Sequence, residues 1–336
     1  MGCAAASSLT GIKGVRNLIR FIIQRIFMVI PVIIIVSFIV YTLVDLAPGS
    51  AVDSMITAEM TQDQIDEIMA QFDMDRSMFY RYGKYMLNFV QGNLGTSMTT
   101  RASIWDTYIS RLPNTLILAL SGLIIGVSVA IPLGIRAAKR AGTISDNVTT
   151  VFVVLGISMP SFWLALLLLQ LFSQTLGWLP ASSIEITFRG LVMPAVCSGL
   201  GLMATATRQT RSSMLDVLRA DYLRTARAKG VPEKVVIRKH ALGNALIPIV
   251  TVIGGSLSMS LAGSVIIEQV FAWPGVGRMA VEGLGQRDVP TVLGTVILTS
   301  TFYVLIQIVV DIVYAFVDPR IKSRYVNTSR KRKAAA

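Results

Sequence analysis

The sequence is poor in the residues that build disulfide frameworks and metal sites. Its 336 residues include only two cysteines, Cys3 and Cys197, and one histidine, His240. Cys3 lies near the N-terminus and Cys197 lies in an apolar run, so no disulfide framework is expected. A zinc site needs about four nitrogen, sulfur or oxygen ligands held together. We therefore expect this chain to bind no metal of its own.

Charged residues are also scarce, at 15% of the chain, against roughly 25% in soluble proteins. Hydrophobic residues make up 53%. The sequence contains no G-x-x-x-x-G-K-[ST] loop for nucleotide phosphates. Together these features exclude an ordinary soluble core and indicate a membrane protein, and the sequence offers no motif for a nucleotide site of its own.

Six long stretches carry no charge, and most are near the ~20 residues that a helix needs to cross the hydrocarbon layer. The first is too long for the ~7–15-residue core of a cleaved signal peptide, so we expect it to be retained. We predict an all-α, multi-pass membrane protein with six transmembrane helices. The stretches are residues 26–44, 112–135, 147–184, 190–207, roughly 241–267, and 289–310.

The basic residues are distributed unequally between the two sides that these spans define. Of the 31 lysines and arginines, 23 fall on the side that holds both termini. Because cytosolic loops are enriched in Lys and Arg, we expect both termini to be cytosolic. The basic run 330–333 is interpreted as a solvated tail attracted to lipid, and not as a nucleic-acid site.

The resulting organisation has five parts. We predict a cytosolic tail (1–25), a first span (26–47), an extracytoplasmic segment (48–111), a core of five spans (112–317) and a basic cytosolic tail (318–336). Within the outer segment, Thr61-x-x-Gln64 is a capping-box pattern and predicts the start of a short amphipathic helix.

Residues 212–246, on the cytosolic side, predict two helices joined by a tight turn. Ser213-x-x-Asp216 is expected to start the first helix, and Gly230 to end it. Pro232 and Glu233 are expected to start the second, which continues into the next span. Such an elbow could pass force from a soluble partner into the membrane. From the helical pattern alone, an ordinary loop with a surface helix remains an equal alternative.

The residues of this predicted elbow also resemble a motif of a known protein family. Asp221-Tyr222-Leu223-Arg224-Thr225-Ala226-Arg227-Ala228-Lys229-Gly230, followed by residues 240–248, closely resembles the cytoplasmic "EAA" loop of binding-protein-dependent ABC importer permeases in the dipeptide/oligopeptide/nickel branch. The likeness covers nearly the whole chain after residue 25. Further landmarks of that family are Leu46-Ala47-Pro48-Gly49, residues 92–97, 111–115, 158–163 and 177–180, Phe271-Ala272-Trp273-Pro274-Gly275-Val276-Gly277, and Asp318-Pro319-Arg320.

The resemblance implies a type I ABC importer permease fold in the cytoplasmic membrane of a bacterium or archaeon. It implies a homologous second permease, two ABC ATPase subunits that bind ATP and Mg, and an extracytoplasmic solute-binding protein. Peptides would be the cargo, with nickel or another metal chelate as the alternative. The sequence departs from the motif where Arg224 replaces its glutamate and Thr225 its first alanine. The residues that the resemblance assigns to ATPase coupling are Asp221, Arg224, Ala226, Ala228 and Gly230.

Three further residues are candidates for the pathway or its gate. Pro160 is expected to kink the third span. Glu268, at an outer span end, is a candidate for gating or for contact with the binding protein, with packing as an equal alternative. Asp311 is an ionisable residue within a span, although pairing near the inner surface also explains it. A channel or carrier that needs no ATPase, or a scaffold, remains a distant alternative, because the docking elbow and the missing internal repeat argue against a self-sufficient carrier.

Overall fold

The computed structural model describes residues 27–46, 60–71 and 73–317. The two predicted tails, residues 1–25 and 318–336, lie outside these ranges, as do most of the Leu46–Gly49 motif and Phe72. The described residues form helices and no strand, with one isolated β-bridge between Thr96 and Ser103.

Within the described residues, five unbroken helices are long and apolar enough to cross a membrane. A bent pair of helices passes the same test together and gives a sixth crossing when it is counted as one span, so each of the six predicted apolar runs is largely helical. The five are Phe27–Leu46, α4 (Ile104–Lys139), α7 (Phe188–Leu218), a composite helix of α9 (Glu233–Val235), the π-helix η3 (Val236–Ala241) and α10 (Leu242–Val270), and α12 (Val289–Val317).

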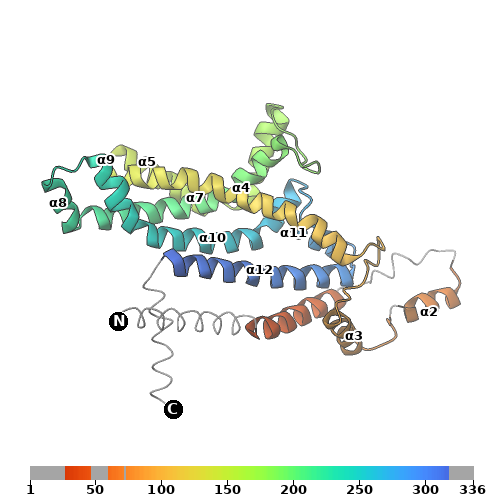
Figure 1. Ribbon diagram of the computed structural model, residues 1–336. Coiled ribbons are helices and arrows are strands. Elements are labelled where there is room, and N and C mark those ends of the chain that lie inside the picture. Colours follow the sequence, from red (N-terminus) through yellow and green to blue (C-terminus); the bar gives the residue numbers. More distant parts are fainter. Residues whose placement is uncertain (1–26, 47–59, 72, 318–336) are drawn as a thin grey trace, which may run out of the picture.

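The bend predicted at Pro160 is present and breaks the third span in two. Helix α5 (Ile144–Ser158) is followed by α6 (Ser161–Leu168) and the π-helix η2 (Leu169–Thr175), and the two halves meet at 104°. Met159, directly before the proline, has the extended conformation that proline imposes on its predecessor. In Figure 1, the light-green α6 and η2 segment projects away from the roughly parallel α4, α7, α10 and α12.

Helices α4 and α7 pack closely because small residues recur every four positions along α4. A side chain on Gly122 would meet Ser198 Oγ at 2.8 Å, and one on Gly134 would meet Thr210 Cβ at 2.5 Å. From the other side, a side chain on Gly199 would lie 2.6 Å from the carbonyl oxygen of Gly122. Close approach of this kind drives helix association in lipid, where no hydrophobic effect is available. The α4 seam consists of Gly122, Gly126, Ala130, Gly134 and Ala138, all buried.

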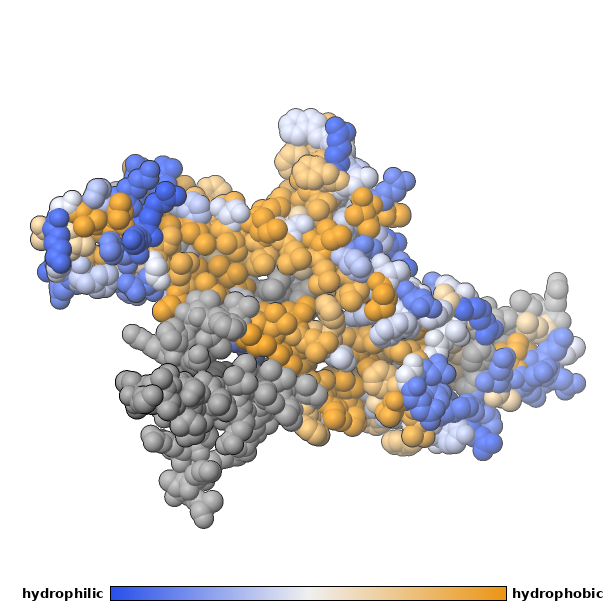
Figure 2. Space-filling view, viewed as in Figure 1, coloured by the Kyte–Doolittle hydropathy of each residue, from blue (hydrophilic) through white to orange (hydrophobic). Residues whose placement is uncertain are grey.

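Polar helices lie at the two ends of this bundle. We call the end that carries α8 (Asp221–Ala228) the elbow end (Figure 1). We call the opposite end the staple end; it carries α3 (Met78–Val90) and α11 (Val276–Gly285), with α2 (Gln62–Gln71) beyond them. Figure 2 shows a hydrophobic band between two hydrophilic ends, as a bilayer requires.

Two expectations for the segment 48–111 can be compared with the structure. The Gln64 side chain accepts a hydrogen bond from the Thr61 N–H at 2.9 Å, as in a capping box, and α2 begins at Gln62. Helix α4 begins at Ile104, inside the stretch assigned to the outer segment, and is capped by Ser103 Oγ, which accepts from Asp106 N at 3.3 Å. The span was predicted from a charge-free run. Charged residues in the first turns of α4 interrupt that run, so the predicted span starts later than the helix.

Candidate functional site

The elbow at one end of the bundle is formed by a break in a long helix. Helix α7 runs through Ser213 without interruption, so the predicted start at Ser213 was wrong. Ser213 is buried, and its Oγ accepts a hydrogen bond from Gln209 Nε2 at 3.0 Å instead of capping a helix. The break falls at Arg219 and Ala220, where Ala220 turns to φ −72° and ψ 142°.

Leu223 holds α8 against the rest of the elbow. Its side chain is fully buried in a cluster with residues from α4, α7, η3 and α10. The neighbouring Tyr222 is 44% exposed, because the chain restarts after Ala220 in a new helical register that turns Leu223 inward. The buried members of the cluster are Ala138, Met214, Leu223, Val236, Ile237, Ala241, Ala245 and Ile249.

Three features fix α8 and the turn that follows it. Gly230 has φ +74°, the left-handed conformation predicted for a helix stop. Arg227 donates two hydrogen bonds of 3.0 Å to the Glu233 carboxylate across the turn. Asn244 Nδ2 donates to the Tyr222 hydroxyl oxygen at 2.9 Å, which ties α8 to α10. The elbow is therefore a packed unit and not a loose loop.

The predicted coupling residues occupy the outer surface of this unit. The side chains of Asp221 and Arg224 are 94% and 78% exposed, and their 3.7 Å ion pair is too exposed to stabilise much. Ala228 and Gly230 are also exposed, while Ala226 is partly buried against the Leu223 cluster. Four of the five residues thus lie on a surface that nothing in the described chain covers.

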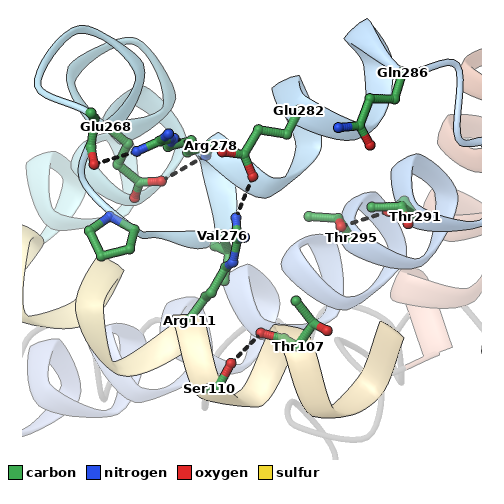
Figure 3. Close-up of polar contacts among 12 residues, drawn as sticks. Thr107, Ser110, Arg111, Glu268, Val276, Arg278, Glu282, Gln286, Thr291 and Thr295 are labelled. Carbon is green, nitrogen blue, oxygen red and sulfur yellow. Dashed lines mark hydrogen bonds and ion pairs between the residues drawn. The ribbon is translucent and has the colours of Figure 1, made fainter. Parts of the chain in front are cut away.

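At the staple end, Glu268 connects three elements by its carboxylate. Its Oε1 accepts from Thr115 Oγ1 of α4 at 2.7 Å and from Ser264 Oγ at 3.1 Å. Its Oε2 accepts from the Arg278 backbone N–H of α11 at 2.9 Å (Figure 3). Glu268 is fully buried. The carboxylate does not reach the surface, and its hydrogen bonds join α10 to α4 and α11.

The loop around Glu268 is fitted closely to α4. Trp273 Nε1 donates to the Asn114 carbonyl at 3.0 Å, and Asn114 Nδ2 donates to the Pro274 carbonyl at 2.8 Å. A side chain on Gly275 would overlap the Glu268 carboxylate, and one on Gly277 would lie 2.8 Å from Val265. The Phe271–Gly277 motif therefore encodes a tight turn that seats α11 on α4.

Nearer the surface of the same end, Glu282 accepts from two arginines. Arg111 Nη1 lies 2.7 Å from one oxygen and Arg278 Nε lies 2.8 Å from the other (Figure 3). The three side chains are 24% to 34% exposed, so water weakens each pair. Arg111 belongs to a motif quoted from the sequence, but its partner, 171 residues away, could not be identified from it.

The segment that precedes α4 is attached to the bundle through Asp288, at the start of α12. This carboxylate is buried and accepts from Ser97 Oγ at 2.5 Å, from the Met98 N–H at 3.1 Å and from Thr291 Oγ1 at 2.9 Å. It therefore caps α12 and binds the loop before α4 at the same time. In α3 of this segment, burial raises the pKa of the Tyr85 phenol, which keeps it neutral.

A buried ion pair near the elbow end was missed by sequence reasoning. Arg211 of α7 donates to both carboxylate oxygens of Asp146, at 2.6 and 2.8 Å, and the Gly142 N–H donates to the same carboxylate at 2.9 Å. Asp146 is 2% exposed. A signal was available: Asp146 directly precedes the predicted span 147–184, and it lies in the first turn of α5, where the helix N-terminus favours negative charge.

The other two candidate residues, Pro160 and Asp311, lie outside the elbow and the Glu268 turn. Pro160 is exposed at the bend between α5 and α6, and Asp311 Oδ1 accepts from Gln307 Nε2 at 3.3 Å one turn earlier in α12. Residues 27–46, 60–71 and 73–317 contain no group of three His, Cys, Asp or Glu side chains placed to hold a metal ion. Three exposed glycines, Gly201, Gly243 and Gly255, have no neighbouring atom within 4 Å of where a side chain would begin.

These features define a class: a multi-pass helical membrane protein in which an elbow and a staple end flank an apolar bundle. The comparisons with known proteins agree. Residues 130–323 match the family model of the binding-protein-dependent transport system inner membrane component, and residues 18–119 match the model of its N-terminal part. The chain belongs to this family of permeases, which work within multi-subunit transporters.

Three curated relatives resemble the chain over almost their whole length. The oligopeptide transport system permease protein AppB of Bacillus subtilis is 35% identical over 312 residues, covering 90% of this chain and 99% of that protein. The glutathione transport system permease protein GsiC of Escherichia coli is 37% identical over 305 residues (91% and 99%). The di/tripeptide transport system permease protein DppB of Pseudomonas aeruginosa is 34% identical over 333 residues (91% and 99%).

A solved structure supports the fold. An inward-facing structure of the MetNI methionine ABC transporter aligns with a TM-score of 0.51 at 18% identity, covering 63% of this chain and 96% of the matched chain. The predicted type I ABC importer permease fold is confirmed.

Proposed function

We propose that this chain is one of two homologous permease subunits that form the pathway of an ATP-driven importer for small peptides. The names of its relatives, which denote oligopeptide, di/tripeptide and glutathione transport, support this class of cargo. A solute-binding protein would deliver the peptide on the extracytoplasmic side. Two ABC ATPase subunits would bind ATP and Mg on the other, so this chain would carry out no catalysis and hold no cofactor.

The observation that carries the proposal is the construction of the elbow. Helix α8 presents Asp221, Arg224 and Ala228 to solvent, while Leu223 on its opposite face is fully buried among residues of α4, α7 and α10. A push on α8 would be passed to the bundle, because Leu223 anchors this helix in a buried cluster shared with α4, α7, η3 and α10. An ATPase docked here would move three spans together. The proposal makes the elbow end cytosolic and both termini cytosolic.

The exposed glycines of α7 and α10 support the presence of a second permease. A glycine facing lipid exposes its backbone and costs about 1 kcal/mol relative to alanine in a helix. A side chain at Gly201, Gly243 or Gly255 would meet no atom of the described chain within 4 Å, so a second subunit or the solute pathway is expected to lie there. Pro160 would place the bend of the third span beside this pathway. Asp311 of α12 would be a further residue that lines it.

The test is ATP-driven peptide uptake by the complete complex in proteoliposomes. Arg224→Ala removes a charged side chain from the exposed face of α8 without touching the Leu223 cluster. We expect it to lower both ATPase co-purification and uptake by at least about ten-fold, the equivalent of roughly 1.4 kcal/mol of binding. Arg140→Ala, at the exposed end of α4, makes the same change outside the elbow and should leave both unchanged. Uptake by this chain alone, without an ATPase, would refute the proposal.

A further inference from the structure

A groove near the elbow end has no role in the function described above. It has a volume of about 620 Å³ and lies between α4, α5 and α7. Most of its lining is apolar, with Val148 and Phe152 from α5 and Met203 from α7. Its polar lining residues are Arg136, Ser145, Thr149 and Thr207.

The polarity of the groove changes along its length. Helix α5 starts at the elbow end, so Ser145 lies at the mouth and Val153 deeper in the bundle. Helices α4 and α7 run the other way, which places Arg136 near the mouth and Met203 deeper. The groove thus has a cationic, hydroxyl-bearing mouth and an apolar interior.

The depth of the groove fits one leaflet of a bilayer. From Ile144 to Val153, α5 advances by about 14 Å at 1.5 Å per residue. Half of the ~30 Å hydrocarbon layer is about 15 Å. A molecule that filled this groove would therefore have a polar head at the membrane surface and a chain reaching the midplane.

The positive charge at the mouth of the groove determines which lipid headgroup would bind there. Arg136 is the one charged side chain that lines the groove in the part of the chain that the structure describes, and it is exposed. No acidic residue competes for it there, because the carboxylate of Asp146 already receives two hydrogen bonds from Arg211. Basic pockets between transmembrane helices on the cytoplasmic side suit anionic lipid headgroups.

We propose that this groove is a binding site for an anionic phospholipid of the inner leaflet. The phosphate lies beside Arg136 with Ser145 within the mouth, and one acyl chain lies along Val148, Phe152 and Met203. The site rests on the orientation given under the proposed function, in which the elbow end is cytosolic. Lipid bound here would join α5, which precedes the Pro160 bend, to the close-packed α4–α7 pair.

The test is native mass spectrometry of the complete, delipidated complex titrated with phosphatidylglycerol or phosphatidylcholine. We expect phosphatidylglycerol to bind more tightly, and Arg136→Gln to weaken it about five-fold, the equivalent of the ~1 kcal/mol that one basic residue contributes at an anionic surface. Arg219→Gln, an exposed arginine outside the groove, should change nothing. Val148→Trp should fill the groove and weaken binding of both lipids.

Several results would overturn the site. Equal affinity for the two lipids would contradict a preference for an anionic headgroup. Equal losses of affinity in Arg136→Gln and Arg219→Gln would show that the general surface charge, and not the groove, attracts the lipid. A disulfide-trapped helix of another subunit on Val148→Cys, with no lipid retained, would assign the groove to a protein contact. Lipid binding is measured without transport, so failure of the uptake assay would leave this result intact.

Discussion

Replacing Glu268 with alanine tests whether the staple end depends on one buried carboxylate. The change removes the acceptor of three hydrogen bonds, from Thr115, Ser264 and the Arg278 N–H. The two hydroxyls can turn toward other acceptors, but the backbone N–H cannot. An unsatisfied buried donor costs about 1–3 kcal/mol. Adding the loss of packing around a fully buried side chain, we expect about 3–5 kcal/mol of destabilisation.

Cys197 provides the assay for this prediction. It is 3% exposed and packs in one apolar cluster with Phe271 and Trp273, which border the Glu268 turn. In a Cys3→Ser background, a thiol-reactive fluorophore should label Cys197 only when this cluster opens on heating. At about 2–4 °C per kcal/mol, Glu268→Ala should lower the labelling midpoint by roughly 6 °C or more.

Two matched variants sharpen the result. Glu268→Gln keeps the shape but replaces one acceptor oxygen by an NH₂ donor, so we expect an intermediate shift. Glu185→Ala removes an exposed carboxylate from the same end and should shift the midpoint by less than about 1 °C. A labelling midpoint in Glu268→Ala equal to that of the wild type would refute the reasoning that this carboxylate holds the turn.

Two further predictions concern the bundle itself. Gly134→Val places atoms 2.5 Å from Thr210 and should cost more than about 3 kcal/mol, seen as loss of folded protein in detergent by size-exclusion chromatography, whereas Gly201→Ala, with open space around it, should be tolerated; equal recovery of both would contradict the seam. Asp146→Asn should cost about 1–3 kcal/mol, because it removes the charged acceptor of two hydrogen bonds from Arg211 while water still solvates that 34% exposed side chain, and the double variant with Arg211→Gln should lose less than the two single losses together, measured by the same thiol labelling. Simple additivity would show that the pair does not interact.

The spans could be predicted from the sequence because a charge-free run has one physical explanation at this length. The Gly230 stop was predictable for a similar reason, since few residues other than glycine adopt φ +74° at a helix end. The break at Arg219–Ala220 was not, because no proline or glycine marks it. Once that break shifted the register, Leu223 and not Tyr222 became the anchor of α8.

The polar contacts of the candidate site were beyond sequence reasoning for a different reason. Glu268 was singled out as an ionisable residue at a span end, but its partner Thr115 lies 153 residues away. Asp146 and Arg211 are separated by 65 residues. Such pairs are set by how helices pack, and packing depends on many small contacts at once. The glycine spacing of α4, by contrast, was legible in the sequence and was overlooked.

The small-residue seam of α4 has a consequence for how such a molecule can change shape. Two helices whose backbones touch cannot slide or separate without opening a void along their whole length, so α4 and α7 must rotate as one body. At 36 residues, α4 is about 54 Å long and extends past the hydrocarbon layer. A tilt of about 5° at one end would therefore displace the other by roughly 5 Å. The third span is broken at Pro160, so α5 can follow such a swing without carrying α6 along as part of one straight helix.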